Sequence, residues 1–175
     1  MKVQKTYIKG LLIIKLDKHK DKRGNLVKIL DKKNSKKFKN KCYESYITTS
    51  KKGSVRGLHG QSGKYSQDKI IYCLNGKLID IVIDIRKNSK TFGKIYTKIL
   101  KEEDALAIFI PKGFLHGYVS LKRKTIIVNY SSSAYNQKKE VGVNVNSLPI
   151  KLPKIKLIYS KKDKELPSYK NLINK

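Results

Sequence analysis

Three histidines hold most of this sequence's capacity to move protons near neutral pH, because histidine changes its charge in that range without strong perturbation. His19 stands in a run of charged residues and is expected to be a solvated loop residue. His59 ends an Arg-Gly-Leu-His segment, and His116 follows a Pro-Lys-Gly turn. For either of the latter two alone, a structural role is the better interpretation. Together they are candidates for acid–base chemistry in a pocket, where Arg56 could hold a phosphate.

A metal site is the alternative use of the same histidines. A cage of several histidines and a carboxylate would need another histidine near His59, but the residue two positions further on is Gln61. Cys42 and Cys73 are far apart and form no CxxC pair, so we expect small core residues and neither a zinc site nor a disulfide framework. No metal and no cofactor are therefore expected.

The net charge of +28 indicates a polyanionic partner, either nucleic acid, an anionic membrane or a phosphorylated small molecule. Only four of the 41 basic residues are arginine, whereas dedicated readers of phosphates and bases favour the arginine fork. The lysines are spread along the chain, and the block 36–41 lacks an interleaved recognition pattern. This favours solvated lysine-rich faces over a nucleic-acid interface.

Segments with a period of two predict an all-β domain. In 79–85, Ile79, Ile81, Ile83 and Ile85 share one face, and the other face carries two aspartates. Asn75-Gly76 predicts a tight antiparallel hairpin between the flanking strands. Further strands are expected at 8–16, 26–30, 43–49, 95–100, 105–110 and 125–130, with a short helix at 32–40.

The chain is expected to form one domain over 1–175, a sandwich or jelly-roll barrel with residues 152–175 packing over it. The apolar stretch 11–14 is too short for a signal peptide or a membrane span. We therefore expect a cytoplasmic protein that does not bind membranes.

Eight short motifs in a fixed order resemble the dTDP-4-dehydrorhamnose 3,5-epimerase family. The resemblance runs from about Asp21 to Pro167. The motifs are Asp-Lys-Arg-Gly at 21–24, Arg-Gly-Leu-His at 56–59, Gln-Asp-Lys at 67–69, Asp-Ile-Arg at 84–86, Ser-Lys-Thr-Phe-Gly at 89–93, Ile-Pro-Lys-Gly-Phe at 110–114, His-Gly at 116–117 and Ser-Lys-Lys-Asp at 160–163.

The resemblance implies a metal-free cupin jelly-roll barrel with short peripheral helices, usually a homodimer. It also implies epimerisation of a nucleotide-linked 4-keto-6-deoxy sugar at carbons 3 and 5, in the synthesis of capsule or lipopolysaccharide precursors. Such chemistry needs a base, a group that stabilises the enolate, and a proton donor on the opposite face of the sugar.

The motif match also implies roles for individual residues. His59 would be the base and Asp163 its partner, while Lys69 and His116 would stabilise the enolate and Asp84 would orient one of them. Arg56, and Arg23 from across the dimer, would hold the diphosphate. Gln61 and Lys162, beside the base and its partner, are expected to contact the substrate.

The sequence departs from the family pattern at the proton donor. The family's proton-donating tyrosine aligns with Asn129, and an amide cannot donate a proton near neutral pH. Tyr130 should point to the opposite face of its strand. Tyr135, which matches a second family tyrosine, or a bound water would then be the donor, and inversion should favour one centre, carbon 3.

The nucleobase region differs as well. Leu26 and Lys28 replace an aromatic and an acidic residue that help to hold thymine, and Glu44 and Tyr46 replace a glutamine and an asparagine. Glu44 could accept hydrogen bonds from guanine and Tyr46 could stack on a base, so a GDP-linked sugar, including a heptose, stands beside a dTDP-linked one. A sugar-nucleotide-binding protein without activity and a basic nucleic-acid-binding barrel are the alternatives from other classes.

Overall fold

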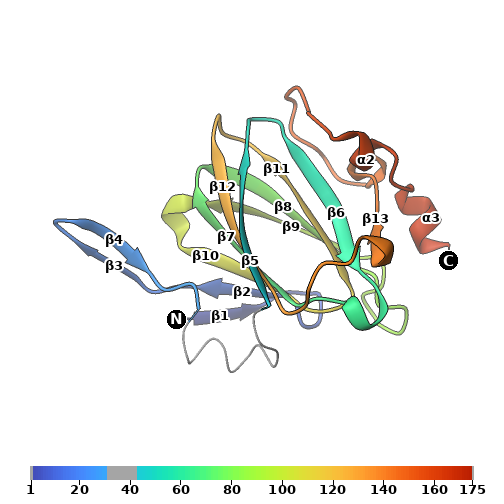
Figure 1. The fold of residues 1–175 in the computed structure, drawn as a ribbon, viewed down its shortest axis with the longest axis horizontal. Helices are drawn as coiled ribbons and strands as arrows, with labels where there is room; N and C mark the ends of the chain where they lie inside the picture. The colour runs from blue at the N-terminus through green and yellow to red at the C-terminus, as the bar shows by residue number, and fades with distance from the viewer. Residues whose placement is uncertain (1, 31–42, 175) are drawn as a thin grey trace.

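The computed structural model describes residues 2–30 and 43–174, which form a two-sheet antiparallel barrel (Figure 1). The six-stranded sheet has the order β1-β2-β10-β7-β12-β5 and the five-stranded sheet the order β13-β6-β11-β8-β9. The expected all-β jelly roll is confirmed. The strands are β1 (Lys2–Lys5), β2 (Leu12–Lys15), β3 (Lys18–Asp21), β4 (Gly24–Val27), β5 (Glu44–Ser50), β6 (Val55–Gln61), β7 (Lys69–Asn75), β8 (Lys77–Asp84), β9 (Ile95–Lys101), β10 (Leu106–Ile110), β11 (Phe114–Ser120), β12 (Thr125–Ser131) and β13 (Glu140–Gly142).

The two faces of β8 separate the barrel interior from its outer cover. Leu78 and Val82 belong to the interior core, whereas Ile81 and Ile83 belong to a second core on the outer side of the five-stranded sheet. The isoleucine face predicted from the sequence is therefore the outward one. The face that carries the two aspartates looks into the barrel, where buried carboxylates need partners.

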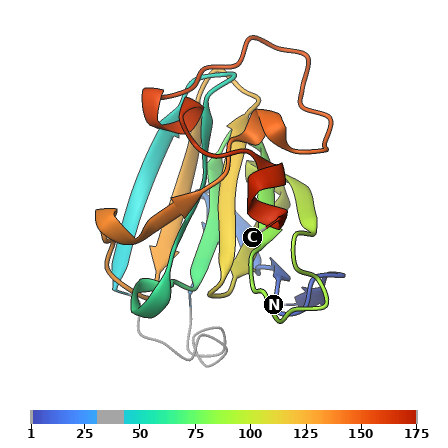
Figure 2. The same cartoon turned by 90° about the vertical axis from the view of Figure 1, so that its right-hand side faces the viewer.

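The C-terminal segment lies over the outer side of the five-stranded sheet (Figure 2), where its side chains cover these outward isoleucines. Val143, Val145 and Leu148 are buried in the outer core, and side chains from 150–172 pack against it. Two short helices, α2 (Lys161–Lys164) and α3 (Tyr169–Ile173), follow, each with a serine that caps its first turn. This packing brings the Ser-Lys-Lys-Asp motif next to β6.

The expected hairpin at Asn75-Gly76 is wrong. β7 pairs with β10 and β12, while β8 pairs with β9 and β11, so the turn carries the chain from one sheet to the other. Only Gly76 of the two residues has a positive φ, whereas a type I′ turn needs both. Glu102 binds the turn through the Gly76 amide and the Asn75 side chain, at 2.7 and 2.9 Å.

Other local expectations also need correction. The strand expected at 8–16 is only Leu12–Lys15, because the chain turns through Gly10 with a φ of 94°. His19 is exposed as expected, but it lies on β3 and not in a loop. The strand expected at 26–30 runs instead over Gly24–Val27. The helix expected at 32–40 and Cys42 lie outside the described residues.

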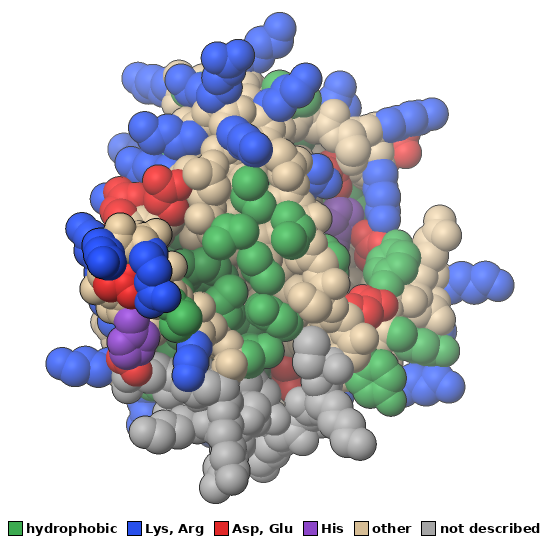
Figure 3. Space-filling model, turned by 60° about the vertical axis from the view of Figure 1, so that its left-hand side comes forward, with side chains coloured by type: hydrophobic (Ala, Val, Ile, Leu, Met, Phe, Trp, Pro, Cys, Tyr) green, Lys and Arg blue, Asp and Glu red, His purple; other side chains and the backbone are tan. Residues whose placement is uncertain are grey.

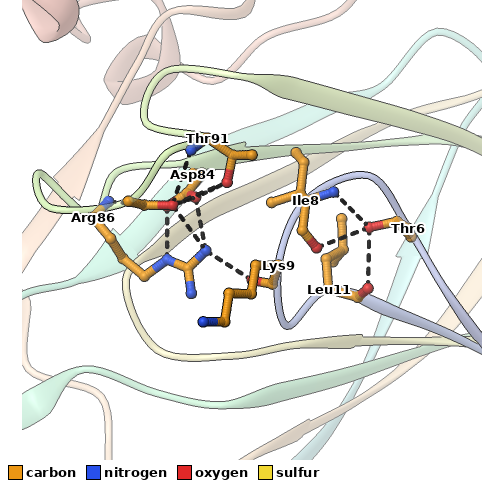
Figure 4. A network of polar contacts seen from close by, with 8 residues as sticks. Thr6, Ile8, Lys9, Leu11, Asp84, Arg86 and Thr91 are labelled. Carbon is orange, nitrogen blue, oxygen red and sulfur yellow. Dashed lines mark hydrogen bonds and ion pairs between the residues drawn. The ribbon is translucent and has the colours of Figure 1, made fainter.

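Asp84 anchors a structural network at one end of the barrel (Figure 4). It accepts hydrogen bonds from Arg86, Ser89 and Thr91, and Arg86 also donates to the Lys9 carbonyl at 2.8 Å. Burial alone would raise the pKa of Asp84, but these hydrogen bonds outweigh it and bring the pKa to about 2. The Asp-Ile-Arg and Ser-Lys-Thr motifs are therefore a clamp that joins the loop after β8 to the N-terminal turn.

Cys73 is fully buried in the interior core, as expected for a small core residue, and burial raises the pKa of its thiol to about 12. Within the described parts of the chain, no helix is long and apolar enough to cross a membrane.

Candidate active site

A cavity of about 680 Å³ lies between the two sheets, where the interior changes from apolar to polar. Along β7 the inward residues run from Cys73 and Ile71 to Lys69, and along β12 they run from Ile127 to Asn129. The period-two pattern of each strand determines which residues face inward, and the types of these residues produce the gradient. The core stabilises one end of the barrel and leaves the other end for polar side chains that converge on a ligand-sized space.

His59, on β6, lies between two carboxylates. Its Nε2 is 2.6 Å from Asp163 Oδ1, and its Nδ1 is 2.5 Å from Glu140 Oε1. Asp163 is buried and is fixed by α2, since Ser160 accepts a hydrogen bond from the Asp163 amide at 3.0 Å. The contact of Nδ1 with Glu140 does not have hydrogen-bond geometry. The imidazole thus has one firmly held nitrogen, and a positive charge on the ring would be stabilised by both acids.

Glu140 connects the base to two further side chains. The Tyr135 hydroxyl donates to Glu140 Oε2 at 2.5 Å, and Lys162 Nζ lies 2.7 Å from the same oxygen. Burial alone would raise the pKa of Glu140, but the hydrogen bonds from Lys162 and Tyr135 outweigh it, so the pKa lies below its usual value. Sequence reasoning missed Glu140 because it belongs to no motif. Its one signal was scarcity, since the chain has only 13 acidic residues.

His116 is the neighbour of His59 on the adjacent strand. The two are paired in the β6–β11 register, and His116 Nε2 is 2.6 Å from the buried Asp80 Oδ2. The close approach of these strands requires glycine, because a Cβ on Gly57 (φ 90°) would lie 2.7 Å from the His116 carbonyl oxygen. The prediction that Asp84 orients a catalytic residue is wrong for His116, whose carboxylate partner is Asp80. Asp84 belongs to the clamp described above.

Lys69 faces the histidines from the six-stranded sheet. It is half-buried in the pocket wall, and burial lowers the pKa of its ammonium, an effect that the charges of Glu140 and Glu44 oppose. A lysine with these surroundings can stabilise a negative charge that develops on a bound carbonyl oxygen.

Two of the expected substrate contacts hold the loop that carries Tyr135. Glu44 Oε1 accepts a hydrogen bond from the Tyr135 amide at 2.9 Å, and Gln61 Oε1 accepts one from the Asn136 amide at 3.0 Å. Both side chains also line the pocket. Arg56 lines the pocket as an exposed residue whose guanidinium donates to Ser50 and to the Thr49 carbonyl.

Three expected residues do not line this pocket. Arg23 is 85% exposed and pairs with Asp21 on the β3–β4 hairpin, which projects from the barrel (Figure 1). Leu26 on the same hairpin and Lys28 just after it are also exposed.

Asn129 is buried in the wall opposite His59, and its side-chain amide reaches the Tyr46 and Ile127 carbonyls only at 3.5 Å. Tyr130 packs into the apolar cluster on the outer side of the six-stranded sheet, as its place on a strand predicts. Of the two tyrosines that the sequence offered in place of the missing donor, Tyr135 lines the pocket and Tyr130 does not. Tyr46, which was expected to stack on a base, also lines it.

Among residues 2–30 and 43–174, no group of three or more histidine, cysteine or acidic side chains is arranged to hold a metal ion. The two histidines of the pocket pair with carboxylates instead. A histidine held by a buried carboxylate, opposite a lysine in the interior of a two-sheet barrel, defines a cupin-type acid–base enzyme.

Comparison with known proteins identifies the family. The sequence profile of dTDP-4-dehydrorhamnose 3,5-epimerase matches residues 5–171. The chain is 32% identical over 168 residues to the dTDP-4-dehydrorhamnose 3,5-epimerase of Shigella flexneri, and the match covers 93% of each chain. The chain therefore belongs to the dTDP-4-dehydrorhamnose 3,5-epimerase family, whose members are isomerases.

Solved structures agree with this assignment. The dTDP-4-dehydrorhamnose 3,5-epimerase of Elizabethkingia anophelis is 34% identical and superposes with a TM-score of 0.88, covering 98% of this chain and 97% of that one. The dTDP-6-deoxy-D-glucose-3,5-epimerase of Legionella pneumophila, solved in complex with dTDP-4-keto-L-rhamnose, is 27% identical. Its TM-score is 0.90, with 97% and 93% of the two chains covered.

Proposed function

We propose that the protein epimerises a nucleoside-diphosphate-linked 4-keto-6-deoxy sugar at the carbons next to its ketone. The observation that carries this proposal is the placement of the His59–Asp163 pair opposite Lys69 in one cavity. A base and a cation on facing walls suit proton abstraction next to a carbonyl, because the charge that leaves the carbon accumulates on the oxygen.

In the proposed reaction His59 takes a proton from carbon 3 or carbon 5, and the C–H electron pair moves into an enolate. Asp163 and Glu140 stabilise the imidazolium that forms. Lys69 stabilises the enolate oxygen, and His116, held by Asp80, lies next to the base as a second donor to the sugar. Lys162 and Gln61 complete the wall around the sugar.

Arg56 at the pocket rim is the proposed anchor of the diphosphate, since its guanidinium offers paired donors. The proposed nucleotide is dTDP or GDP, and the sugar a hexose or a heptose. Family membership supports dTDP, while Glu44 and Tyr46 are the substitutions that keep GDP open. Glu44 is already engaged by the Tyr135 amide, which leaves it less free to read a guanine edge.

The active form is proposed to be a homodimer. The outer side of β5 exposes Ile47 to 63%, next to the apolar cluster that includes Val128 and Tyr130. Figure 3 shows hydrophobic side chains gathered on one face of the molecule, in a chain whose surface is otherwise rich in lysine. The projecting β3–β4 hairpin would then carry Arg23 to the partner's diphosphate, which accounts for its exposure. We further propose one domain, acting in the cytoplasm on precursors of capsule or lipopolysaccharide.

The test is proton NMR of dTDP- and GDP-linked 4-keto sugars in deuterated water with the wild-type protein and with His59→Asn. We expect deuterium at carbon 3, carbon 5 or both with the wild type and none with the variant. Wild-type exchange that survives in His59→Asn would contradict the mechanism, and a monomer in analytical ultracentrifugation would contradict the dimer.

A further inference from the structure

Inversion of a carbon needs a proton from the face opposite the base, and a phenol is the neutral donor best suited to that step. Four tyrosines line the pocket: Tyr46, Tyr118, Tyr135 and Tyr159. Asn129, where the resemblance places the donor, has no transferable proton near neutral pH. The donor must therefore be a hydroxyl that lies on the wall facing His59 and is not held by another protein group.

Three of the four hydroxyls are held by protein groups. The Tyr118 hydroxyl lies 2.9 Å from Ser50 Oγ and 3.1 Å from Thr48 Oγ1. Tyr159 donates to Asn146 Oδ1 at 2.5 Å.

Tyr135 donates to Glu140, whose other carboxylate oxygen contacts His59. Glu140 is the first residue of β13, which pairs with β6 beside His59. The Tyr135 hydroxyl is therefore bound to the acid that contacts the base, and it lies on the base's side of the pocket, not on the opposite side.

Tyr46 lies on the opposite wall. It is on β5, in the six-stranded sheet, and its partner in the β5–β12 register is Asn129. Directly opposed residues of an antiparallel pair share one face and have Cβ atoms about 5 Å apart. Glu44 and Thr48, two residues to either side of Tyr46, also line the pocket, so this alternation points the phenol inward.

The Tyr46 hydroxyl is available for proton transfer. Among the described parts of the chain it has no hydrogen-bond partner, and the residue, which lines the pocket, is 42% exposed. Burial of part of the ring raises the pKa of the phenol, and the charge of Glu44 adds to this, so the group keeps its proton at neutral pH.

We propose that Tyr46 is the proton donor for inversion, reaching the sugar from the strand next to the one that carries Asn129. This assignment rests on the proposed function. His59 removes the proton from one face of the carbon, and the C–H electrons enter the enolate. The electron pair then returns to the carbon as a new C–H bond to the Tyr46 proton on the other face. Solvent reprotonates the tyrosinate and takes the proton from His59.

The experiment compares Tyr46→Phe with the wild type in deuterated water, and follows deuterium wash-in and inversion separately in one NMR sample. Phenylalanine keeps the aromatic ring, so stacking on a base would survive while proton donation would not. We expect wash-in through His59 to stay within about threefold of the wild type, and inversion to fall by about 10² or more. Tyr43→Phe, a variant of an exposed tyrosine outside the pocket, is the matched control and should change neither rate.

A second variant, Tyr46→Phe with Asn129→Tyr, moves the phenol to the neighbouring strand and should recover inversion. Normal inversion by Tyr46→Phe would overturn the assignment and leave stacking as the role of this ring. Equal losses of wash-in and inversion would also overturn it, because a positioning role slows both. A wild-type protein that exchanges no deuterium at all would overturn the proposed function itself, and the assignment with it.

Discussion

His59 and His116 lie opposite each other on neighbouring strands, and each is held by a different buried carboxylate. The partner of His59 is Asp163, on a helix 104 residues further along the chain. The partner of His116 is Asp80, on β8, the strand next to its own. The two histidines therefore share a surface but not a hydrogen-bond network. This separation predicts different consequences when each acid is neutralised.

Asp163→Asn should slow exchange at both sugar carbons by about 10² or more, because His59 loses the partner that stabilises its positive charge. Initial rates of deuterium wash-in measure the effect. Substrate affinity should change little, since Asp163 is buried against His59 and a carboxylate is not a ligand for phosphates. A loss confined to affinity would show that Asp163 only shapes the pocket.

Asp80→Asn should lower turnover by about tenfold or more while leaving the base in place, because His116 loses the charge that orients it. The matched control is Asp84→Asn on the same face of β8. Asp84 binds Arg86, Ser89 and Thr91 in the clamp, so its variant should lose stability and keep the turnover of the folded fraction. Loss of turnover in Asp84→Asn but not in Asp80→Asn would instead show that Asp84 orients the catalytic residue.

The pKa of Asp84 predicts a pH-dependent part of the stability. A carboxyl whose pKa falls from 3.8 in the unfolded chain to about 2 in the folded one stabilises the fold above pH 4. That stabilisation, about 2 kcal/mol, is lost as the pH falls from 4 through 2. Urea unfolding at pH 5 and pH 2.5 measures it. The difference in unfolding free energy between wild type and Asp84→Asn should shrink at the lower pH, and a constant difference would contradict the prediction.

The sequence was sufficient for the parts of the site that follow from local pattern. Strand alternation predicted that Tyr130 faces away from the pocket, which the outer apolar cluster confirms. It also separated the isoleucine and aspartate faces of 79–85, but it could not say which face is the interior. That depends on the C-terminal segment, whose burial over the isoleucines is a long-range contact with no local signal.

The sequence did not show which strands pair with one another, or in which register. Asn75-Gly76 has the composition of a hairpin turn, yet the two flanking strands join different sheets, where β7 pairs with β12 and β8 pairs with β9. For the same reason the sequence treated Tyr46 and Asn129 as separate departures, 83 positions apart. Only the register of β5 and β12 shows that they are neighbours on one wall.

Arg56→Ala should weaken the binding of dTDP and GDP by similar factors, roughly tenfold each, because it removes charge-assisted hydrogen bonds to the shared diphosphate. Titration calorimetry with both nucleotides measures this. GDP should bind at least as tightly as dTDP, because four positions of the nucleobase region differ from the family pattern: Leu26, Lys28, Glu44 and Tyr46. Arg123→Ala, an exposed arginine outside the pocket, is the control. A strong preference of the wild type for dTDP would refute the reading of those four positions.

The position of Tyr46 predicts that the two carbons next to the ketone do not invert equally. Neighbouring strands are about 4.8 Å apart, so a phenol on β5 approaches the sugar ring from a different place than a phenol on β12 would. Carbon 3 and carbon 5 lie on either side of the ketone, and a displaced donor cannot serve both with the same geometry. We expect carbon 3 to invert faster, with carbon 5 exchanging its proton but returning it to the same face.

Asn129→Tyr in an otherwise unchanged chain adds a second phenol and should raise inversion at the slower carbon at least severalfold, without changing wash-in at either. The measurement is the ratio of inversion to wash-in at each carbon by NMR. Equal ratios at both carbons in the wild type would rule out a displaced donor, and a loss of inversion alone in Tyr135→Phe would assign the donor to Tyr135 instead.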